Sequence, residues 1–352
     1  MERIIGVPRA GRTPSQVIIG NGAASRLREL LPAARTIVIT DPNVERHWHA
    51  LTEGFERIVI GTGESSKTLA TVEEVYRRLI ALDADRTCCI VGVGGGIVTD
   101  VAGFVASTFM RGVRFGFVAT TLLAQVDASV GGKNGVNVDG FKNMAGVFNQ
   151  PDFVLCDSSM LATLPGRELR AGLSEAIKSG IIADAELFER IEAQRPEELF
   201  SDLGALAGIV ASAVGVKSRI VEADEREAGE RRLLNLGHTF AHAVEKCTGR
   251  FLHGEAVAIG MDIISRIAVA TGDMSRGSCE RIRSLLLRVG LPVESGVEMS
   301  RLLRAVRQDK KRSSESIYVT LPCEVGRCRI AKMPLTELER LALAVEPDSA
   351  ER

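Results

Sequence analysis

The stretch CIVGVGGGIVTDVAGF (residues 89–104) carries the strongest indication of the fold. An apolar, β-like run passes into a glycine-rich turn at residues 92–96, and a helical pattern begins near Ile97. Glycines allow a tight turn and close approach of a pyrophosphate, while a helix N-terminus offers free N–H groups. A strict G-x-G-x-x-G pattern fails because Ile97 replaces its last glycine. The segment therefore predicts a strand–turn–helix unit that either cradles a phosphate or forms a tight structural turn only.

Short β-branched runs recur on both sides of this unit, separated by longer amphipathic stretches such as Ala23–Leu31 and Thr68–Leu82. Alternation of strand and helix predicts a mainly parallel sheet covered on both faces. The expected strands are SQVIIG (15–20), TIVITD (36–41), RIVIG (57–61), TCCIVGV (87–93), RFGFVATT (114–121) and FVLCD (153–157).

The second half of the chain has a different pattern. Residues 165–309 are almost purely helical, and the runs SIYVTLP (316–322) and RCRIAKM (327–333) predict a hairpin before a last helix, Leu335–Leu343. For 352 residues two domains are expected. We predict an α/β N-terminal domain at 1–160 and a mainly α-helical domain at 161–352.

Composition restricts the classes of partner. Lys plus Arg total 44 against 45 Asp plus Glu, so no overall positive charge attracts nucleic acid or an anionic membrane. The start of the chain lacks a signal-peptide pattern, and no run of about 18 apolar residues was found. The seven cysteines are odd in number and contain no Cys-x-x-Cys spacing, which favours reduced thiols. These features predict a cytoplasmic protein without a nucleic-acid or membrane partner.

Two segments of the first half have the polar groups that anionic ligands need. Asp41 ends an expected strand and is either a ribose-binding carboxylate or part of an Asp-Pro turn. The segment 118–146 sets lysines and amides between small residues, which favours binding of phosphate or carboxylate oxygens over a solvated loop.

Three of the five histidines lie in NLGHTFAHAVEKCTGRFLHGE (235–255). His238 and His242 are four residues apart and share a helix face, and His253 follows in the next segment. With Glu175 from an earlier helical run, these side chains favour a catalytic divalent-metal site, because no thiolate belongs to the set. The alternative for Glu175 is a helix-surface ion pair with Lys178.

Taken in order, several motifs of this chain resemble those of the 3-dehydroquinate synthase family. They are GVGGGIVTDVAGF (92–104), FMRGVRF (109–115), TTLLAQVDASVGGKNGVN (120–137), KNMAGVFNQP (142–151), TLPGRELRAGLSEAIKSG (163–180), DEREAGERRLLNLGHTFAHA (224–243), LHGEAVAIGM (252–261) and DKK (309–311). The segments ITDPN and GESSK extend the resemblance back to Asp41.

The resemblance implies a Rossmann-like, dehydroquinate synthase-like NAD domain, a helical metal and substrate domain, and a homodimer. The reaction implied is the conversion of the sugar acid phosphate DAHP (3-deoxy-D-arabino-heptulosonate 7-phosphate) to 3-dehydroquinate and phosphate in the shikimate pathway. It would proceed by transient oxidation by NAD, phosphate elimination, re-reduction and intramolecular aldol closure, with zinc or cobalt as the metal.

The residue roles below follow from the resemblance alone. The metal would be held by Glu175, His238 and His253. NAD would be bound by Asp41, Glu64, Lys67, Gly95, Gly96, Asp100, Thr120, Thr121, Lys133 and Lys142. Catalytic groups would be Asp127, Lys133, Lys178, Asn235 and His242. The substrate would contact Lys142, Asn143, Lys217, Arg231, Lys310 or Lys311, and Arg111 of the partner subunit.

Two other enzyme classes remain open at this stage. Related sugar-phosphate cyclases, similar to 2-deoxy-scyllo-inosose or 2-epi-5-epi-valiolone synthases, cyclise sugars without a carboxylate. Lys217 and Arg231 argue against them, since such a substrate would leave two buried cations unpaired. Metal-dependent polyol dehydrogenases share the layout, but the lysine-rich segment 133–143 favours a phosphate.

The chain also departs from the commonest family pattern at three places, where Thr99, Asn134 with Gly135, and Ser179 stand in the quoted motifs.

Overall fold

The computed structural model of the chain describes residues 2–9, 11–309 and 315–345. The chain divides into two compact units. The first comprises Met1–Pro165 and Phe200–Glu222, and the second comprises Gly166–Leu199 and Ala223–Arg352. The chain therefore leaves the first unit at Pro165 and returns to it for one long helix.

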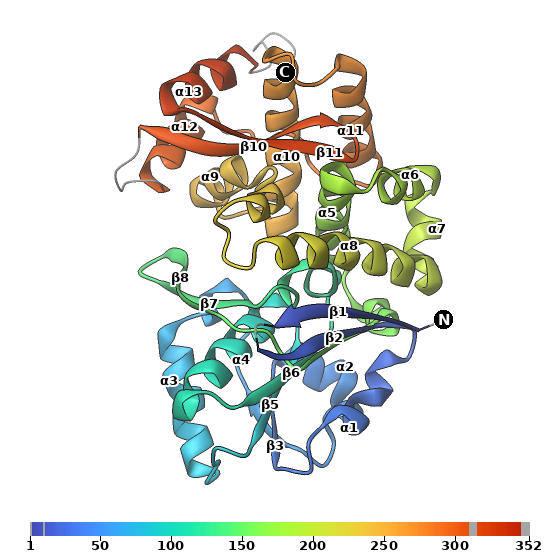
Figure 1. Ribbon diagram of the computed structural model, residues 1–352, viewed down its shortest axis with the longest axis vertical. Helices are drawn as coiled ribbons and strands as arrows, with labels where there is room; N and C mark the ends of the chain where they lie inside the picture. The colour runs from blue at the N-terminus through green and yellow to red at the C-terminus, as the bar shows by residue number, and fades with distance from the viewer. Residues whose placement is uncertain (1, 10, 310–314, 346–352) are drawn as a thin grey trace. The chain divides into compact units, whose positions relative to one another are not determined.

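A seven-stranded sheet forms the centre of the first unit (Figure 1). Its strands lie in the order β1-β2-β9-β6-β5-β3-β4, and every neighbouring pair is parallel except β1 with β2. The mainly parallel sheet predicted from the sequence is confirmed. The strand bounds are β1 Arg3–Arg9, β2 Arg12–Gly20, β3 Thr36–Thr40, β4 Glu56–Val59, β5 Cys89–Gly94, β6 Arg114–Ala119 and β9 Phe153–Asp157.

Helices cover both faces of this sheet. One face packs Val38, Val91 and Leu155 against Leu27 and Val44 of the first two helices. On the other face Gly92 makes room for α4, because a Cβ there would lie 2.9 Å from Ala102 Cβ. The helices of this unit are α1 Leu27–Leu30, α2 Pro42–Thr52, α3 Leu69–Ala81, α4 Gly96–Thr108 and α8 Leu203–Ala223.

The parallel register aligns the carboxyl ends of the central strands. Thr40 pairs with Val93, and Gly94 pairs with Ala119. The Thr40 hydroxyl donates to the Val93 carbonyl over 2.8 Å, and the Thr120 N–H donates to the Gly94 carbonyl over 2.9 Å. The residues that follow these strands therefore lie at one edge of the sheet, where open α/β folds bind their ligands.

An antiparallel hairpin, β7 (Lys133–Val138) with β8 (Phe141–Phe148), lies beside α4. The sequence did not indicate it, because its Lys, Asn and Gly residues are poor strand formers. Asn134 explains part of its placement: its amide donates to the carbonyls of Gly132 (3.1 Å) and Asn149 (2.8 Å). Its carboxamide oxygen fills the space that a side chain at Gly103 would need.

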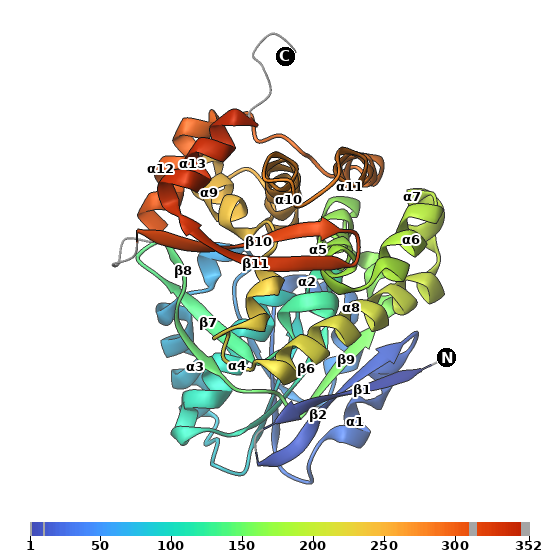
Figure 2. The same cartoon turned by 45° about the horizontal axis from the view of Figure 1, so that its top comes forward.

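The second unit is built around α10 (His253–Ala270), which contacts α5, α9, α11, α13 and β10 (Figure 2). The predicted helical region and terminal hairpin are both present. The remaining bounds are α5 Gly166–Ala183, α6 Ala185–Ala193, α7 Pro196–Ser201, α9 His238–Thr248, α11 Arg276–Arg288, α12 Met299–Asp309, β10 Ser316–Glu324, β11 Arg327–Pro334 and α13 Leu335–Ala344.

Two glycines let α10 approach its neighbours closely. A Cβ at Gly254 would lie 1.8 Å from the carbonyl oxygen of Ala171 in α5. A Cβ at Gly260 would lie 2.0 Å from the carbonyl oxygen of Gly237, which precedes α9. The contacts are to backbone, so the neighbours cannot move aside as a flexible side chain would. The crossings of α10 therefore require glycine.

Within the described residues, α8 is a helix long and apolar enough to cross a membrane. Of its most apolar stretch 61% is buried inside the protein, so packing against the first unit accounts for its composition. Burial of this kind is typical of a core helix, and the length of α8 is weak evidence for a membrane span.

We predict that Gly254→Ala lowers the free energy of unfolding by about 1–3 kcal/mol or more, the usual cost of overpacking. Gly277→Ala in α11 is the matched control, since the nearest atom to its new Cβ is Ser275 Oγ at 3.9 Å. The control should be neutral or slightly stabilising, because alanine reduces the entropy of the unfolded chain. Urea midpoints followed by circular dichroism test this, and equal midpoints for the two variants would contradict it.

Candidate functional site

The carboxyl edge of the first sheet brings together several residues predicted to bind a nucleotide. Gly95 is the N-cap of α4, and a Cβ on it would lie 2.9 Å from Thr121 Cγ2. Asp41 caps α2: its Oδ1 accepts the N–H groups of Asn43 (2.8 Å) and Val44 (3.1 Å). The Asp-Pro turn alternative for Asp41 is thus present in the structure. The edge combines a helix N-terminus, small residues and a carboxylate, which suits a pyrophosphate and a ribose.

A chain of polar contacts joins Glu64, Lys67, Asp100 and Asn143. The buried Lys67 ammonium donates to the Asp100 carboxylate and, over 2.6 Å, to Asn143 Oδ1. Asn137 connects the rest: its Oδ1 accepts the Asn143 N–H (2.9 Å) and its Nδ2 donates to Glu64 Oε1 (2.7 Å). Burial raises the pKa of Asp100 to about 6, although Lys67 acts in the opposite direction. From the sequence, Asn137 was expected only as one of the amides of the segment 118–146, because an amide in a polar segment has no signal that would assign it an individual role.

A π-helical turn, η4 (Ala124–Ala128), presents Asp127 to Lys217 on α8. The Lys217 ammonium donates to the Asp127 main-chain carbonyl over 2.7 Å and to its carboxylate over 2.6 Å. The side-chain amide of Gln125 holds the turn in place by donating to the carbonyls of Ala119 and Asp157. Lys217 therefore has an anionic partner within the protein. A substrate without a carboxylate would still leave Lys217 paired with Asp127, contrary to the expectation from the sequence.

The two lysines of the β7–β8 hairpin are not brought together. Lys133 pairs with Phe148 at the open end, whereas Lys142 lies beside the turn, next to Phe141, which pairs with Val138. Both lysines are exposed. The pattern of two lysines among amides thus corresponds to two separate cationic positions along one hairpin.

Arg111 lies apart from these groups. It is exposed, follows α4, and with Met110 forms two consecutive residues with positive φ angles of 71° and 50°. Positive φ is uncommon for such residues and marks local strain. Because α4 runs 13 residues from the Gly95 cap, Arg111 is about 20 Å from the carboxyl edge of its own sheet.

The second unit contains a cluster of the buried Glu175 with the partly buried His238 and His253, whose ligand atoms all lie within 4.8 Å of one another. Glu175 comes from α5, one turn after Ala171, and His253 is the first residue of α10. Glu175 Oε1 is 3.6 Å from His253 Nε2 and 3.9 Å from His238 Nε2. These separations are too long for hydrogen bonds, and within the described residues no donor reaches this buried oxygen in hydrogen-bond geometry.

The donor set fits a divalent metal ion. Ligands about 2.1 Å from a tetrahedral ion lie about 3.4 Å apart, close to the spacing here. One carboxylate and two imidazoles also leave coordination positions open, as catalytic zinc sites do. The residues present therefore satisfy the requirements of zinc or cobalt without rearrangement of the backbone.

Electrostatics of this cluster depend on burial and on Lys178, whose ammonium lies 2.5 Å from Glu175 Oε2. Lys178 is buried, so the pair is not the solvent-exposed ion pair considered from the sequence. Burial raises the pKa of Glu175, but Lys178 and the two histidines outweigh it and hold that pKa well below its usual range. Burial and Lys178 lower the pKa of His238 to about 3. Burial also lowers the pKa of His253, but Glu175 and Glu245 raise it to about 9.

His242 lies one helical turn beyond His238, with ring centroids 5.7 Å apart, and is outside the set of ligand atoms. Asn235 ends the turn η6 (Glu230–Asn235), and its amide donates to the Glu227 carboxylate. Glu227 has a φ of 61°, in a loop tied by Asp224, whose carboxylate accepts three main-chain N–H groups. Glu227 was not among the residues expected at the site, because a positive φ at a glutamate cannot be inferred from the amino-acid sequence.

Arg231 is 1% exposed, and its guanidinium donates to the Glu225 carbonyl in the same loop. Lys310 and Lys311 lie outside the described residues. Two of the family departures bond within their own helices: the hydroxyls of Thr99 and Ser179 donate to the carbonyls of Gly96 and Glu175, both over 3.1 Å. The third, Asn134, makes the contacts to Asn149 and Gly103 described above.

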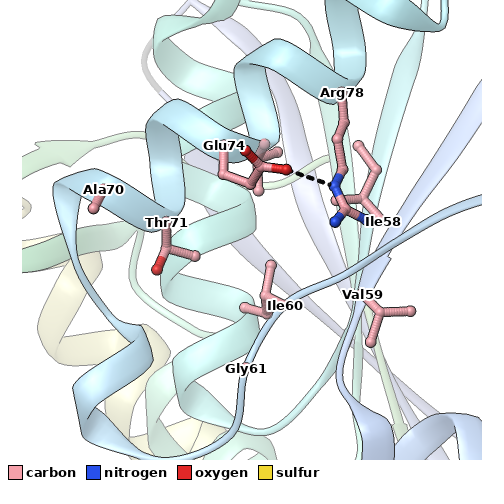
Figure 3. A pocket seen from close by; sticks show the side chains of 9 residues that line it. Ile58, Val59, Ile60, Gly61, Ala70, Thr71, Glu74 and Arg78 are labelled. Atoms are coloured by element: carbon pink, nitrogen blue, oxygen red, sulfur yellow. Dashed lines mark hydrogen bonds and ion pairs between the residues drawn. The ribbon is translucent and has the colours of Figure 1, made fainter.

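Two pockets lie away from these clusters. One, of about 310 Å³, lies between β4 and α3 and is lined by Ile58, Val59, Ile60, Gly61, Ala70, Thr71, Glu74, Val75 and Arg78 (Figure 3). Its charged residues, Glu74 and Arg78, bond each other over 3.0 Å. The other, of about 510 Å³, lies in the second unit beside Arg167, Arg250 and Glu255. Neither pocket contains a residue that the sequence analysis assigned to a site.

Comparison with known proteins identifies the family. Two family models match: 3-dehydroquinate synthase N-terminal over residues 57–171 and 3-dehydroquinate synthase C-terminal over residues 172–312. The 3-dehydroquinate synthase of Synechococcus sp. strain CC9605 is 42% identical over 338 residues, covering 91% of each chain. That of Koribacter versatilis is 42% identical over 330 residues, covering 90% of each chain.

Solved structures extend the comparison to other cyclases. A 2-deoxy-scyllo-inosose synthase in complex with carbaglucose-6-phosphate, NAD+ and Co2+ has a TM-score of 0.87 at 25% identity, covering 97% of this chain and 100% of its own. The 2-epi-5-epi-valiolone synthase of Streptomyces hygroscopicus, with NAD+ and Zn2+ bound, has a TM-score of 0.85 at 27% identity, covering 96% and 99%. A protein of Sinorhizobium meliloti described as a probable glycerol dehydrogenase shares the fold at 17% identity, with a TM-score of 0.65, covering 93% of this chain and 95% of its own. The sequence relatives and both family models agree, and the chain belongs to the 3-dehydroquinate synthase family.

Proposed function

We propose that this protein converts DAHP to 3-dehydroquinate and phosphate with NAD and a divalent zinc or cobalt ion. The observation that carries the proposal is the cluster of Glu175, His238 and His253, in a chain whose curated relatives are 3-dehydroquinate synthases. Such a cycle is a phosphate-eliminating lyase reaction, since the hydride taken from the substrate returns to it and no net oxidation occurs.

The metal would supply a Lewis acid for a substrate hydroxyl, and NAD would supply a temporary hydride acceptor. Within the proposal the first unit holds NAD through the edge formed by Asp41, Gly95, Gly96, Thr120 and Thr121. The network of Glu64, Lys67 and Asp100 keeps a buried ammonium in place beside that edge. The second unit holds the metal.

Charged side chains would bind the anionic groups of the substrate. Lys142 with its neighbour Asn143 suits phosphate oxygens, because ammonium and amide groups donate several hydrogen bonds. Lys133 lies at the other end of the hairpin and would contact a separate anionic group. Arg231 and Lys217 suit the carboxylate, with Lys217 shared with Asp127. A substrate carboxylate would then have to share or displace the Asp127 contact.

Proton transfer is assigned to groups beside the metal cluster. His242 can accept or donate a proton at a ring nitrogen, and Asn235 orients the Glu227 carboxylate by donating to it. Lys178 keeps Glu175 ionised, which is the state needed for metal binding.

We further propose that the protein works as a homodimer in the cytoplasm. Arg111 is too far along α4 to reach the carboxyl edge of its own sheet, which supports its predicted role in the site of a partner subunit. All seven cysteines are free thiols, as expected of a reducing compartment.

A related sugar-phosphate cyclase activity is the second candidate, favoured by the TM-scores of 0.87 and 0.85 with such enzymes. Sequence identity favours the first candidate, since it is 42% with 3-dehydroquinate synthases and 25–27% with the other cyclases. Substrate choice depends on side chains rather than on fold.

The purified protein should release phosphate from DAHP when NAD and Zn2+ are present. Release should stop after chelator treatment and resume on addition of the metal, while absorbance at the NADH band stays flat because the cofactor is regenerated in each turnover. Consumption of sedoheptulose 7-phosphate or glucose 6-phosphate, without phosphate release from DAHP, would point to the second candidate. Steady accumulation of NADH would point to a dehydrogenase.

His253→Ala should abolish stoichiometric zinc binding and activity together, because it removes a ligand from the cluster. Metal content after gel filtration measures the first, and phosphate release measures the second. His47→Ala in α2 is a suitable control, since that histidine lies in the first unit and outside the cluster. A His253→Ala protein that retains one zinc per chain would refute the ligand assignment.

A further inference from the structure

Both imidazoles of the metal cluster are held through the ring nitrogen that faces away from Glu175. His238 Nδ1 is 3.1 Å from the Leu236 carbonyl oxygen, and His253 Nδ1 is 3.1 Å from Glu245 Oε1. A carbonyl or an ionised carboxylate only accepts hydrogen bonds, so each Nδ1 carries the proton. The Nε2 of each ring faces Glu175 and is the nitrogen left to bind a metal ion.

The two groups that accept the hydrogen bonds of the Nδ1 atoms differ in kind. The support of His238 is a main-chain carbonyl, which no substitution removes. The support of His253 is a side chain with a negative charge, and its side chain is only 9% exposed. His238, His242 and Glu245 follow at positions i, i+4 and i+7 of α9, so one helix face carries a ligand, a neighbouring histidine and the support of the next ligand.

The main chain at His253 is fixed by other residues. Glu255 accepts the Leu252 N–H over 2.9 Å at the start of α10, and Arg167 donates twice to the Glu255 carboxylate, both over 2.7 Å. Gly254 lies against Ala171 of α5. Loss of Glu245 would therefore leave the start of α10 in place and release the rotation of the imidazole ring.

We propose that Glu245 is a positioning residue for the metal ligand His253. Its carboxylate fixes the tautomer and the ring orientation, and its charge makes the imidazole a stronger donor to a cation. With a divalent ion bound, the charges of Glu175 and Lys178 cancel each other. The negative charge of Glu245 then reduces the net charge of the site from +2 to +1. The inference rests on the metal site of the proposed function, but not on the identity of the substrate.

Zinc affinity measured by competition with a chromophoric chelator, in the absence of substrate, tests the role of Glu245. Glu245→Ala should weaken zinc binding roughly 10- to 100-fold, the range found for the outer partners of ligating histidines. Glu245→Gln keeps an acceptor oxygen without the charge and should weaken it less, by about tenfold. Glu280→Gln on the exposed surface of α11 is the matched control and should leave the affinity unchanged.

The visible absorption spectrum of the cobalt-loaded proteins provides a second readout, because ligand orientation changes its band positions and intensities whereas a general loss of stability does not. Wild-type affinity and spectrum in Glu245→Ala would overturn the inference. If Glu245→Ala does not fold, Glu245→Gln decides in the same way. A parent protein that binds no zinc would overturn the metal site itself, while failure to turn over DAHP with normal zinc binding would overturn the substrate only.

Discussion

Burial of the Glu175 carboxylate is the constraint on which the second unit depends. An ionised carboxylate removed from water is strongly destabilising unless cations and hydrogen-bond donors surround it. Here Lys178 supplies one positive charge from the same helix, and α9 and α10 bring two imidazoles to the other oxygen. Close packing of α10 on α5 at Gly254 is what makes that approach feasible. The packing of α10 on α5 therefore brings His253 to Glu175, and the buried charge of Glu175 in turn needs the groups that this packing places around it.

In the first unit the main constraint is the alignment of the strand ends. Parallel strands place Asp41, Gly95 and Thr121 at one edge because the register of β3, β5 and β6 brings their last residues level. The buried Lys67 beside this edge is stabilised by Asp100 and Asn143, so a cation is kept in place before any ligand arrives. Such preorganisation lowers the cost of binding an anionic cofactor.

Many of the strands and some of the candidate site residues could be predicted from the sequence, because alternating apolar residues and glycine turns depend on local conformational preferences. The strands around residues 89–94 and the histidines at 238 and 253 are examples. What could not be predicted depends on contacts between distant segments: the return of α8 to the first unit, the π-turn that presents Asp127 to Lys217, and the positive φ of Glu227. The β7–β8 hairpin was missed for a related reason, since packing on α4 overrides the weak strand preference of its residues.

Fold alone does not separate the members of this group of enzymes. A dehydrogenase at 17% identity shares the architecture, and two cyclases with different substrates superimpose on nearly the whole chain. Specificity must therefore depend on side chains rather than on fold, and Lys217 is one of those that the proposed function places at the substrate. Its ammonium is already bonded to Asp127, so a carboxylate gains less there than it would from an isolated cation. Under the proposed function, a substrate carboxylate at this position would compete with Asp127 for one buried ammonium, so we expect both Asp127 and Lys217 to influence which substrates bind.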